Sequence, residues 1–245
     1  MINNFTIDDV RRFWDKAASD YEFLNRKVGY VHTQRFEKAM ELGKIEAGQK
    51  ILNIWSRTGS LLPYLRSISN LEIHNREVSP KIMEIARKRY PNENFCLTDL
   101  ENLSEFESNY FDRIISLETL EHTPKPLLLL RELHRILKPD GLLIMSLPPK
   151  GEEVPEFIYK LFFKDHGEGP HNFLWPYQVK KLIKESGFSL ISHNPYIILP
   201  LGNDKLTRIS EKVLTFIFGK TPFANFGVRH FYISKKIICA EFLAM

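Results

Sequence analysis

The chain has 245 residues, of which 43% are hydrophobic and 26% are charged, and its formal net charge is +4. This composition is typical of a globular protein, and the length suits one large domain or two small ones. The Lys and Arg residues are dispersed rather than gathered into a nucleic-acid-binding patch, and no apolar run approaches the roughly 20 residues that span a membrane.

Residues 5–42 predict two helices. Thr6 followed by Asp9 resembles the start of a helix, and apolar residues then recur at helical spacing from Phe13 to Leu24. A second helix is expected from Val31 up to the residue before Gly43. Because both helices precede the first predicted strand, they can cap a sheet or cover a ligand.

The segment that follows predicts a strand, a tight turn and a helix. The strand is expected over 50–54, the turn over 55–59 and the helix over 60–67. Such a turn can hold a nucleotide, because its free backbone N–H groups and the helix N-terminus face the ligand. Turns of this kind usually carry several glycines, whereas this one keeps only Gly59.

Strands and helices then alternate up to residue 149. Strands are predicted over 71–77, 94–97, 112–117 and 142–147, helices over 80–90 and 126–137, and a turn over 138–141. Successive units of this length predict a parallel sheet covered on both faces, with the ligand over the carboxyl ends of its strands.

Residues 150–176 break this alternation. They hold an aromatic helix candidate over 157–163 and then DHGEGPHNFLWP, a length typical of a lid or a binding loop. The remaining elements are expected to be a basic amphipathic helix (177–186), two strands (189–199 and 229–240), an apolar helix between them (209–220) and an aromatic loop (221–227).

We expect one domain over residues 1–245. Its expected parts are an N-terminal helical cap (1–45), a cofactor-binding core (46–150), a lid-like insertion (151–180) and a C-terminal helix and strands with an apolar insertion (181–245). Cys96 and Cys239 both lie in apolar runs and are expected to be buried free thiols, which favours a reducing, cytoplasmic location. The N-terminus predicts no signal peptide, and no Cys/His cluster predicts a metal site.

Acidic residues follow two of the predicted strands. Glu77 can accept both hydroxyl hydrogens of a ribose, or it can be an ordinary exposed acid. Asp99 can accept a hydrogen bond from an adenine amino group, or it can form an Asx turn. The loop over 116–122 is expected beside the first strand, although Glu118 and Glu121 in it can also be helix-start acids.

Residues 111–148 strongly resemble the class I S-adenosylmethionine-dependent methyltransferases, and the resemblance extends over residues 10–190. The chain shares four features with that family: Glu77-Val78-Ser79-Pro80 at the second strand, Asp99 after the third, Leu120-Glu121-His122 shortly before Pro124, and Lys138-Pro139-Asp140-Gly141 before the fifth.

The resemblance implies an α/β fold, Rossmann-like and doubly wound, with helices on both faces. Its seven-stranded sheet would be mostly parallel with one antiparallel strand. The implied cofactor is S-adenosyl-L-methionine, and the implied reaction is methyl transfer to a small-molecule acceptor. The implied cofactor-binding residues are Asn53, Trp55, Ser56, Thr58, Gly59, Glu77, Val78, Asp99, Leu100, Ser116, Leu117 and Tyr21.

The glycine-rich turn is where the chain departs from this family. The family usually has Asp-hydrophobic-Gly-x-Gly-x-Gly, and this chain has Asn53, Trp55 and Arg57 in place of the acid and the first two glycines. An indole is expected to collide with the usual cofactor pose, and a cation disfavours a sulfonium. Two interpretations follow: an active methyltransferase with a rebuilt site, or an inactive methyltransferase-like protein for binding or assembly.

If the protein is an enzyme, a hydroxyl acceptor needs a general base. The candidate catalytic residues are His171, which precedes a helix in the lid-like segment, and His122. The acceptor can be a sugar, a lipid-linked molecule or a quinone-like precursor. The aromatic segments can line its pocket, form a homodimer face or contact a membrane surface, and no nucleic-acid partner is expected. The turn also lacks GxGxxG, which argues against a nicotinamide-dependent dehydrogenase.

Overall fold

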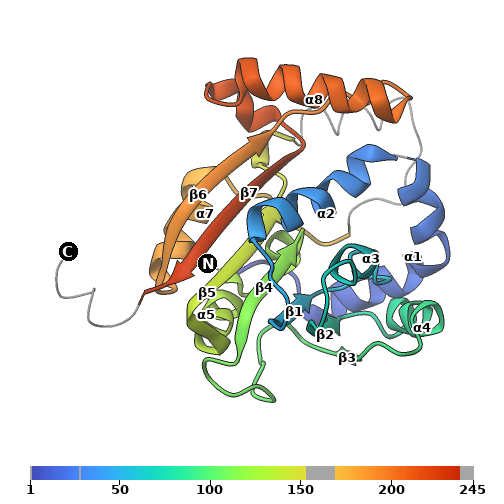
Figure 1. The fold of residues 1–245 in the computed structure, drawn as a ribbon, viewed down its shortest axis with the longest axis vertical. Coiled ribbons are helices and arrows are strands. Elements are labelled where there is room, and N and C mark those ends of the chain that lie inside the picture. Colours follow the sequence, from blue (N-terminus) through green and yellow to red (C-terminus); the bar gives the residue numbers. More distant parts are fainter. Residues whose placement is uncertain (1, 28, 153–168, 238–245) are drawn as a thin grey trace.

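The computed structural model of the protein describes residues 2–27, 29–152 and 169–237, and a seven-stranded sheet forms its centre (Figure 1). The strands lie in the order β3-β2-β1-β4-β5-β7-β6. They are β1 (Lys50–Ile54), β2 (Glu72–Glu77), β3 (Phe95–Leu97), β4 (Phe111–Leu117), β5 (Leu137–Leu147), β6 (Phe188–Tyr196) and β7 (Arg229–Lys236). Strands β1 to β5 are parallel, and β7 runs antiparallel to both of its neighbours, so the predicted fold is confirmed.

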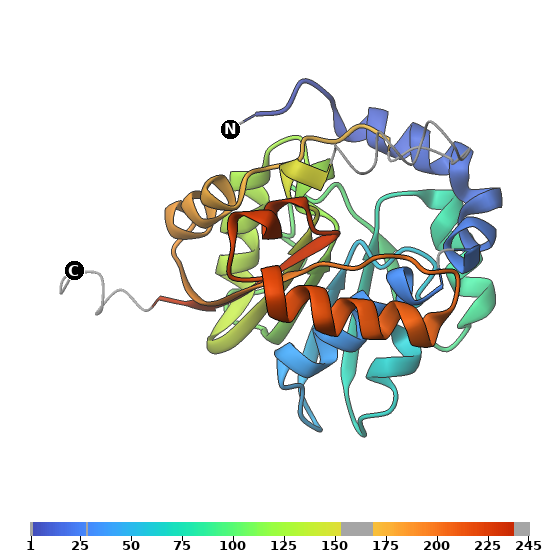
Figure 2. The same cartoon turned by 90° about the horizontal axis from the view of Figure 1, so that it is seen from above.

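Helices cover both faces of this sheet (Figures 1 and 2). They are α1 (Ile7–Lys27), α2 (Tyr30–Gly43), α3 (Leu62–Leu65), α4 (Pro80–Arg89), α5 (Pro126–Ile136), α7 (Pro176–Glu185) and α8 (Asp204–Phe218). Three short 3-10 helices, η1 (Leu120–His122), η2 (Lys150–Glu152) and η3 (Pro222–Phe226), lie in the connections.

The strand period of two divides the core into two layers. On β1, Leu52 packs with α1, α5 and α7, whereas its neighbour Ile51 packs with α2 and α3. On β5, Leu143 and Ile144 divide in the same way. Near-continuous apolar strands are expected for a parallel sheet with both faces covered.

Several predicted elements differ from the structure in extent, among them the strand expected over 189–199, which is β6 and ends at Tyr196. The helix expected over 60–67 is only α3, because i→i+3 bonds from Ser67 and Ile68 end it in a tighter turn. The turn expected over 138–141 lies within β5. Phe111 of β4 pairs with Leu137 and Arg113 pairs with Leu142, so residues 138–141 interrupt the regular pairing of β5 with β4.

The remaining predictions concern the two cysteines and two of the helices. Cys96 is a free thiol as expected but only half-buried, because β3 is an edge strand. Cys239 and the helix expected over 157–163 lie outside the described residues. The apolar helix of the C-terminal part begins earlier than predicted, at Asp204, because the Asn203 side chain accepts hydrogen bonds from the N–H groups of Lys205 and Leu206.

Candidate functional site

The turn after β1 keeps the backbone shape of a glycine-rich turn. Trp55, Arg57 and Gly59 have φ values of 55°, 53° and 79°, in the left-handed region that favours glycine. A Cβ on Gly59 would lie 2.9 Å from the Tyr90 ring, so only glycine fits there. Trp55 and Arg57 therefore replace the first two glycines of the family pattern but keep the left-handed backbone conformation that glycine would have.

Glu77 lies fully buried at the carboxyl end of β2, next to this turn. Its Oε1 accepts hydrogen bonds from Trp55 Nε1 and from the Ser79 N–H, both at 3.0 Å, and its Oε2 accepts from the Arg57 N–H at 2.6 Å. Burial raises the pKa of this carboxyl group, although Arg57 and the backbone N–H groups oppose the shift. The position is the one predicted for a ribose-binding acid, but the protein itself supplies these three donors.

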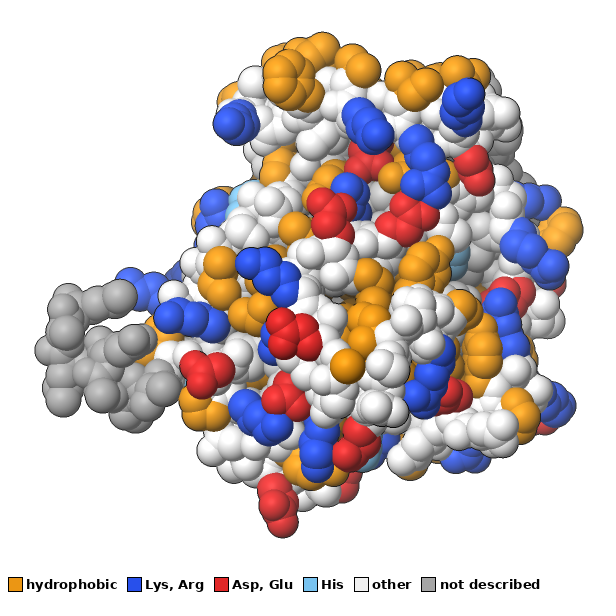
Figure 3. All heavy atoms as spheres, viewed as in Figure 1, with side chains coloured by type: hydrophobic (Ala, Val, Ile, Leu, Met, Phe, Trp, Pro, Cys, Tyr) orange, Lys and Arg blue, Asp and Glu red, His pale blue; other side chains and the backbone are white. Residues whose placement is uncertain are grey.

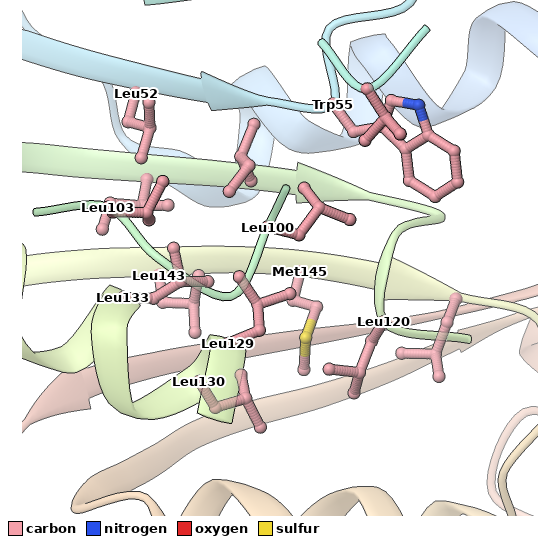
Figure 4. Close-up of a cluster of buried hydrophobic side chains, with 14 of the residues drawn as sticks. Leu52, Trp55, Leu100, Leu103, Leu120, Leu129, Leu130, Leu133, Leu143 and Met145 are labelled. Atoms are coloured by element: carbon pink, nitrogen blue, oxygen red, sulfur yellow. The ribbon is translucent and has the colours of Figure 1, made fainter. Parts of the chain in front are cut away.

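The Trp55 side chain closes over the carboxyl ends of the strands and is only 2% exposed. Figure 4 shows the core leucines of the strands, α5 and the connecting loops, with the Trp55 indole beyond the end of β1. The indole makes edge contacts with Trp14 at 6.0 Å and with His122 at 5.1 Å between ring centroids. An aromatic cluster from α1, the turn and η1 thus fills this part of the site.

The Arg57 guanidinium lies between two of these rings. Its central carbon is 3.6 Å from the centroid of Trp55 and 3.9 Å from that of Trp14, which are cation–π distances. Burial lowers the pKa of Arg57, because removal from water penalises the charged form. Its Nη1 has no hydrogen-bond partner among the described residues, which is uncommon for a buried donor.

A narrow pocket of about 20 Å³ lies beside this cluster, which is room for about one water molecule while the Trp55 indole stays in place. Its walls come from α1, α2, the end of β1, the turn and β4. The residues that line it are Tyr21, Arg35, Phe36, Asn53, Trp55, Ser56, Arg57, Ser60, Leu61 and Leu117. The structure therefore brings together Tyr21, Asn53, Trp55, Ser56 and Leu117 of the predicted cofactor residues.

Arg35 belongs to a buried ion network that sequence reasoning missed. Glu118 pairs with Arg35 of α2 and with Arg229 of β7, whose Nε lies 2.6 Å from Glu118 Oε1. Burial would raise the pKa of Glu118, but the two arginines outweigh it and lower the pKa. The residues are far apart in sequence, and they meet because β7 lies in the same sheet as β4 and because α2 packs on that sheet.

His122 and His171 lie side by side next to the indole, with ring centroids 6.1 Å apart. His122 Nδ1 lies 2.9 Å from the Pro170 carbonyl oxygen and His171 Nδ1 lies 2.8 Å from that of Gly169. Since a carbonyl only accepts, each Nδ1 carries a proton, and in the neutral form of either ring the lone pair is on Nε2. Burial, with Arg57 nearby, lowers the pKa of His122 to about 3, so this ring is neutral at physiological pH.

The other predicted residues have mostly structural partners. Thr58 Oγ1 donates to Glu22 of α1, and the Val78 carbonyl accepts from Arg11 Nε at 3.2 Å. Asp99 is exposed, and its Oδ1 accepts from the N–H groups of Glu101 and Asn102.

Asp99 thus forms the Asx turn that was its alternative interpretation. The next residue, Leu100, is fully buried with φ of 68°. Ser116 is buried on β4 opposite Ile54, and its Oγ has no hydrogen-bond partner among the described residues. Asp99, Leu100 and Ser116 do not line the pocket.

The polar groups at the site fit a nucleoside cofactor once the Trp55 indole is displaced. Glu77 Oε1 then loses its Trp55 partner and can accept from a ribose hydroxyl, while Ser56 Oγ is buried at the pocket without a partner among the described residues. While the Trp55 indole donates to Glu77 Oε1, this oxygen and the turn are inaccessible to a ligand. No group of His, Cys, Asp or Glu side chains in the described parts of the chain is arranged to hold a metal ion.

Comparison with known proteins gives the same assignment. Residues 52–145 match the family model of the methyltransferase domain. The chain is 28% identical over 201 residues to a demethylmenaquinone methyltransferase of Thermotoga maritima, which covers 73% of this chain and 87% of that relative.

Solved structures extend the likeness over nearly the whole chain. An S-adenosylmethionine-dependent methyltransferase of Thermotoga maritima has a TM-score of 0.68 at 19% identity, over 92% of this chain and 99% of that one. The [4+2]-cyclase SpnF has a TM-score of 0.69 at 14% identity, over 97% and 99%. At such low identity these matches concern the fold, which can host more than one chemistry. The resemblance predicted from the sequence is confirmed: the protein has the class I methyltransferase fold, and residues 52–145 have the sequence pattern of the methyltransferase domain.

Proposed function

We propose that the protein transfers a methyl group from S-adenosylmethionine to a small, quinone-like acceptor. The observation that carries the proposal is the buried Glu77 carboxylate beside a turn that keeps three left-handed residues. The demethylmenaquinone methyltransferase relative supports the acceptor class.

In this proposal the chain positions the cofactor and excludes water. Glu77 accepts from the ribose, Asn53 and Ser56 face the amino-acid part, and Asp99 and Leu100 flank the adenine. Gly59, Thr58, Val78, Ser116 and Leu117 shape the backbone around it. The sulfonium methyl is already activated, so correct placement of the acceptor is the main requirement.

The N-terminal helices form the cover of the site. Trp14 and Tyr21 of α1 and Arg35 of α2 all lie against the turn or the pocket. The described part of the lid-like segment adds His171 from the other side. We infer that residues 1–45 act as a cap on a single domain and that the acceptor enters between this cap and His171.

His171 is the proposed proton acceptor for an acceptor hydroxyl. Its Nδ1 donates to the Gly169 carbonyl, which leaves Nε2 as the nitrogen that can accept a proton, and its ring is partly exposed, so substrate can reach it. His122 is buried and neutral, and it holds the Pro170 carbonyl and the indole edge in place. His122 is therefore a positioning residue, which modifies its expected role as a base.

The Trp55–Glu77 hydrogen bond favours a second candidate function. If the indole stays on Glu77, the protein is a methyltransferase-like binding protein without catalysis. The two candidates differ in one measurable property, because only the enzyme incorporates the methyl group.

The test is transfer of a labelled methyl group from S-adenosylmethionine to a demethylated quinol in detergent. We expect incorporation by the unaltered chain and a reduction in kcat of about 10²-fold or more for His171→Asn, the scale of general-base catalysis. His134→Asn is the matched control, because His134 lies on α5 against Phe188. Absence of incorporation in both the unaltered chain and Trp55→Gly would overturn the proposal in favour of the binding protein.

A further inference from the structure

Helix α8 exposes an apolar face and buries a polar one. Its fully buried residues are Thr207 and Glu211, whereas its exposed residues include large apolar side chains. The apolar ones are Leu206, Ile209, Val213, Phe216 and Ile217. Their spacing at three and four residues places them on one side of the helix, so they form a continuous stripe.

Specific contacts fix the rotation of α8 about its axis. Glu211 is 4% exposed, accepts from the Tyr30 hydroxyl and lies 3.3 Å from Gln34 Nε2. On the same side, Thr215 Oγ1 accepts from the Ile197 N–H at 3.0 Å. Turning the stripe inward would break these buried polar contacts, so the outward apolar face is a determined feature of the fold.

The 3-10 helix after α8 extends the apolar face. Phe216 is 90% exposed, and Phe223 and Phe226 of η3 are 65% and 49% exposed. In Figure 3 hydrophobic side chains form the upper edge of the molecule, where Figure 1 shows α8. Contiguous exposed apolar surface of this kind marks an interaction site.

Cationic side chains border the stripe. Lys205 and Lys212 are exposed on one flank of α8, and Lys220 is exposed just after its end. None of the three has an ion-pair partner in the described ranges. Of the acids of the helix, Glu211 is buried and accepts from the Tyr30 hydroxyl, and Asp204 is exposed but accepts from the Tyr30 N–H. An apolar stripe with unpaired lysines along it matches an anionic membrane interface, with chains inserted below and phosphates beside the lysines.

We propose that α8 and η3 dock the protein on the surface of an anionic lipid bilayer. The stripe inserts its aromatic and aliphatic side chains at the level of the headgroups, and the lysines contact lipid phosphates. No helix within the described ranges is long and apolar enough to cross a membrane, so the contact is peripheral. The inference does not rest on the methyl transfer proposed above.

Helix α2 connects the docking face to the pocket. α8 packs on α2, and α2 supplies Arg35 and Phe36 to the pocket (Figure 2). Gln34 of α2 contacts both Glu211 of α8 and Arg229 of the buried ion network. Docking therefore brings the pocket end of the molecule close to the bilayer, where lipid-soluble molecules are found.

The test is co-sedimentation of the full chain with vesicles of phosphatidylcholine alone or mixed with phosphatidylglycerol. We expect binding to the mixed vesicles that weakens with salt. Phe216→Ser should lower the partition constant about tenfold or more, because one large apolar side chain no longer inserts. Lys205→Glu with Lys212→Glu should lower binding to the mixed vesicles and remove its salt dependence.

Tyr177→Ser is the matched control, because Tyr177 is 68% exposed but lies on α7. It should bind vesicles as the unaltered chain does, and thermal melting should show that all variants fold.

Equal binding by Phe216→Ser and the unaltered chain would overturn the proposal. It would also be overturned by absence of vesicle binding together with self-association that Phe216→Ser abolishes, since the face would then join two copies of the chain. Methyl transfer to a detergent-solubilised acceptor is measured separately, so either proposal can fail alone.

Discussion

Trp55 occupies a backbone conformation that suits glycine. A side chain in the left-handed region costs about 1 kcal/mol, and the chain accepts this cost where the indole gains buried contacts with Glu77, Trp14 and His122. The indole also covers the carboxylate proposed to hold the ribose. The same residue therefore stabilises the fold and opposes ligand entry.

Trp55→Gly should separate these two effects. We expect the affinity for S-adenosylhomocysteine to rise about tenfold or more, because Glu77 Oε1 loses its internal partner and the steric block is removed. The free energy of unfolding should fall by roughly 2–4 kcal/mol, the cost of a buried aromatic truncation less the relief of the backbone. Calorimetric titration and urea denaturation measure the two quantities.

Trp175→Phe is the control for that experiment, since Trp175 stands before α7 and should leave the affinity unchanged. An unchanged affinity in Trp55→Gly would mean that the indole does not limit binding.

The sequence predicted the collision of the Trp55 indole with the cofactor, but it did not predict the hydrogen bond of the indole to Glu77. The bond to Glu77 depends on side-chain rotamers and on Trp14 from another helix, and neither is encoded locally.

At the scale of single elements, the start of α4 connects Glu77 to helix α1 through hydrogen bonds of Ser79. Ser79 caps the helix by accepting from the Ile82 N–H at 3.1 Å, and its hydroxyl donates to Asp15 of α1. Its own N–H donates to Glu77. The sequence predicted that a helix begins at Pro80, and Ser followed by Pro is a local signal for the first turn of a helix.

Ser79→Ala should lower the free energy of unfolding by about 1–2 kcal/mol, because a buried cap and a contact between helices are lost together. Ser104→Ala is the control, since Ser104 is exposed and its change should stay within about 0.5 kcal/mol. Urea denaturation followed by circular dichroism measures both. Similar values for the two variants would show that the cap contributes nothing.

Helix α8 shows where a correct element prediction was incomplete. Its apolar residues at helical spacing predicted a helix, and the helix is present. The same pattern is normally a sign of burial, yet here the apolar side faces outward. The reason lies in Glu211, whose contacts with Tyr30 and Gln34 orient the helix and could not be read from the helix itself.

At the scale of the whole molecule, the parallel sheet could be predicted and the state of the cleft could not. The alternation of strands with helical segments locates β1, β2 and β4, and crossovers of this length predict that these strands are parallel. The closed cleft depends on contacts among α1, the β1 turn and η1, which lie far apart in the chain. The part of the lid-like segment that completes it, from Gly169 onward, carries no periodic signal.

Buried neutral histidine makes the fold sensitive to acid. The pKa of His122 is lowered from 6.5 to about 3 by burial and by Arg57. Between these values the unfolded chain binds a proton that the folded chain excludes, so stability is present above pH 6.5 and falls as the pH drops toward 3.

His122→Asn should flatten this dependence. The slope of unfolding free energy against pH between the two pKa values should be smaller than that of the unaltered chain by up to about 1.4 kcal/mol per pH unit. The Asn amide can still donate to the Pro170 carbonyl, which keeps the local structure. Urea denaturation across this pH range gives both slopes, and parallel slopes would mean that His122 titrates normally in the folded chain.

Calorimetric titration with S-adenosylmethionine tests the central claim most directly. We predict saturable one-site binding to the unaltered chain, weakened about tenfold or more in Glu77→Gln, because an amide group replaces one acceptor oxygen at the ribose position. Glu84→Gln, on the exposed side of α4, should bind as the unaltered chain does. Absence of binding heat in both the unaltered chain and Trp55→Gly would contradict the claim that this site holds the cofactor.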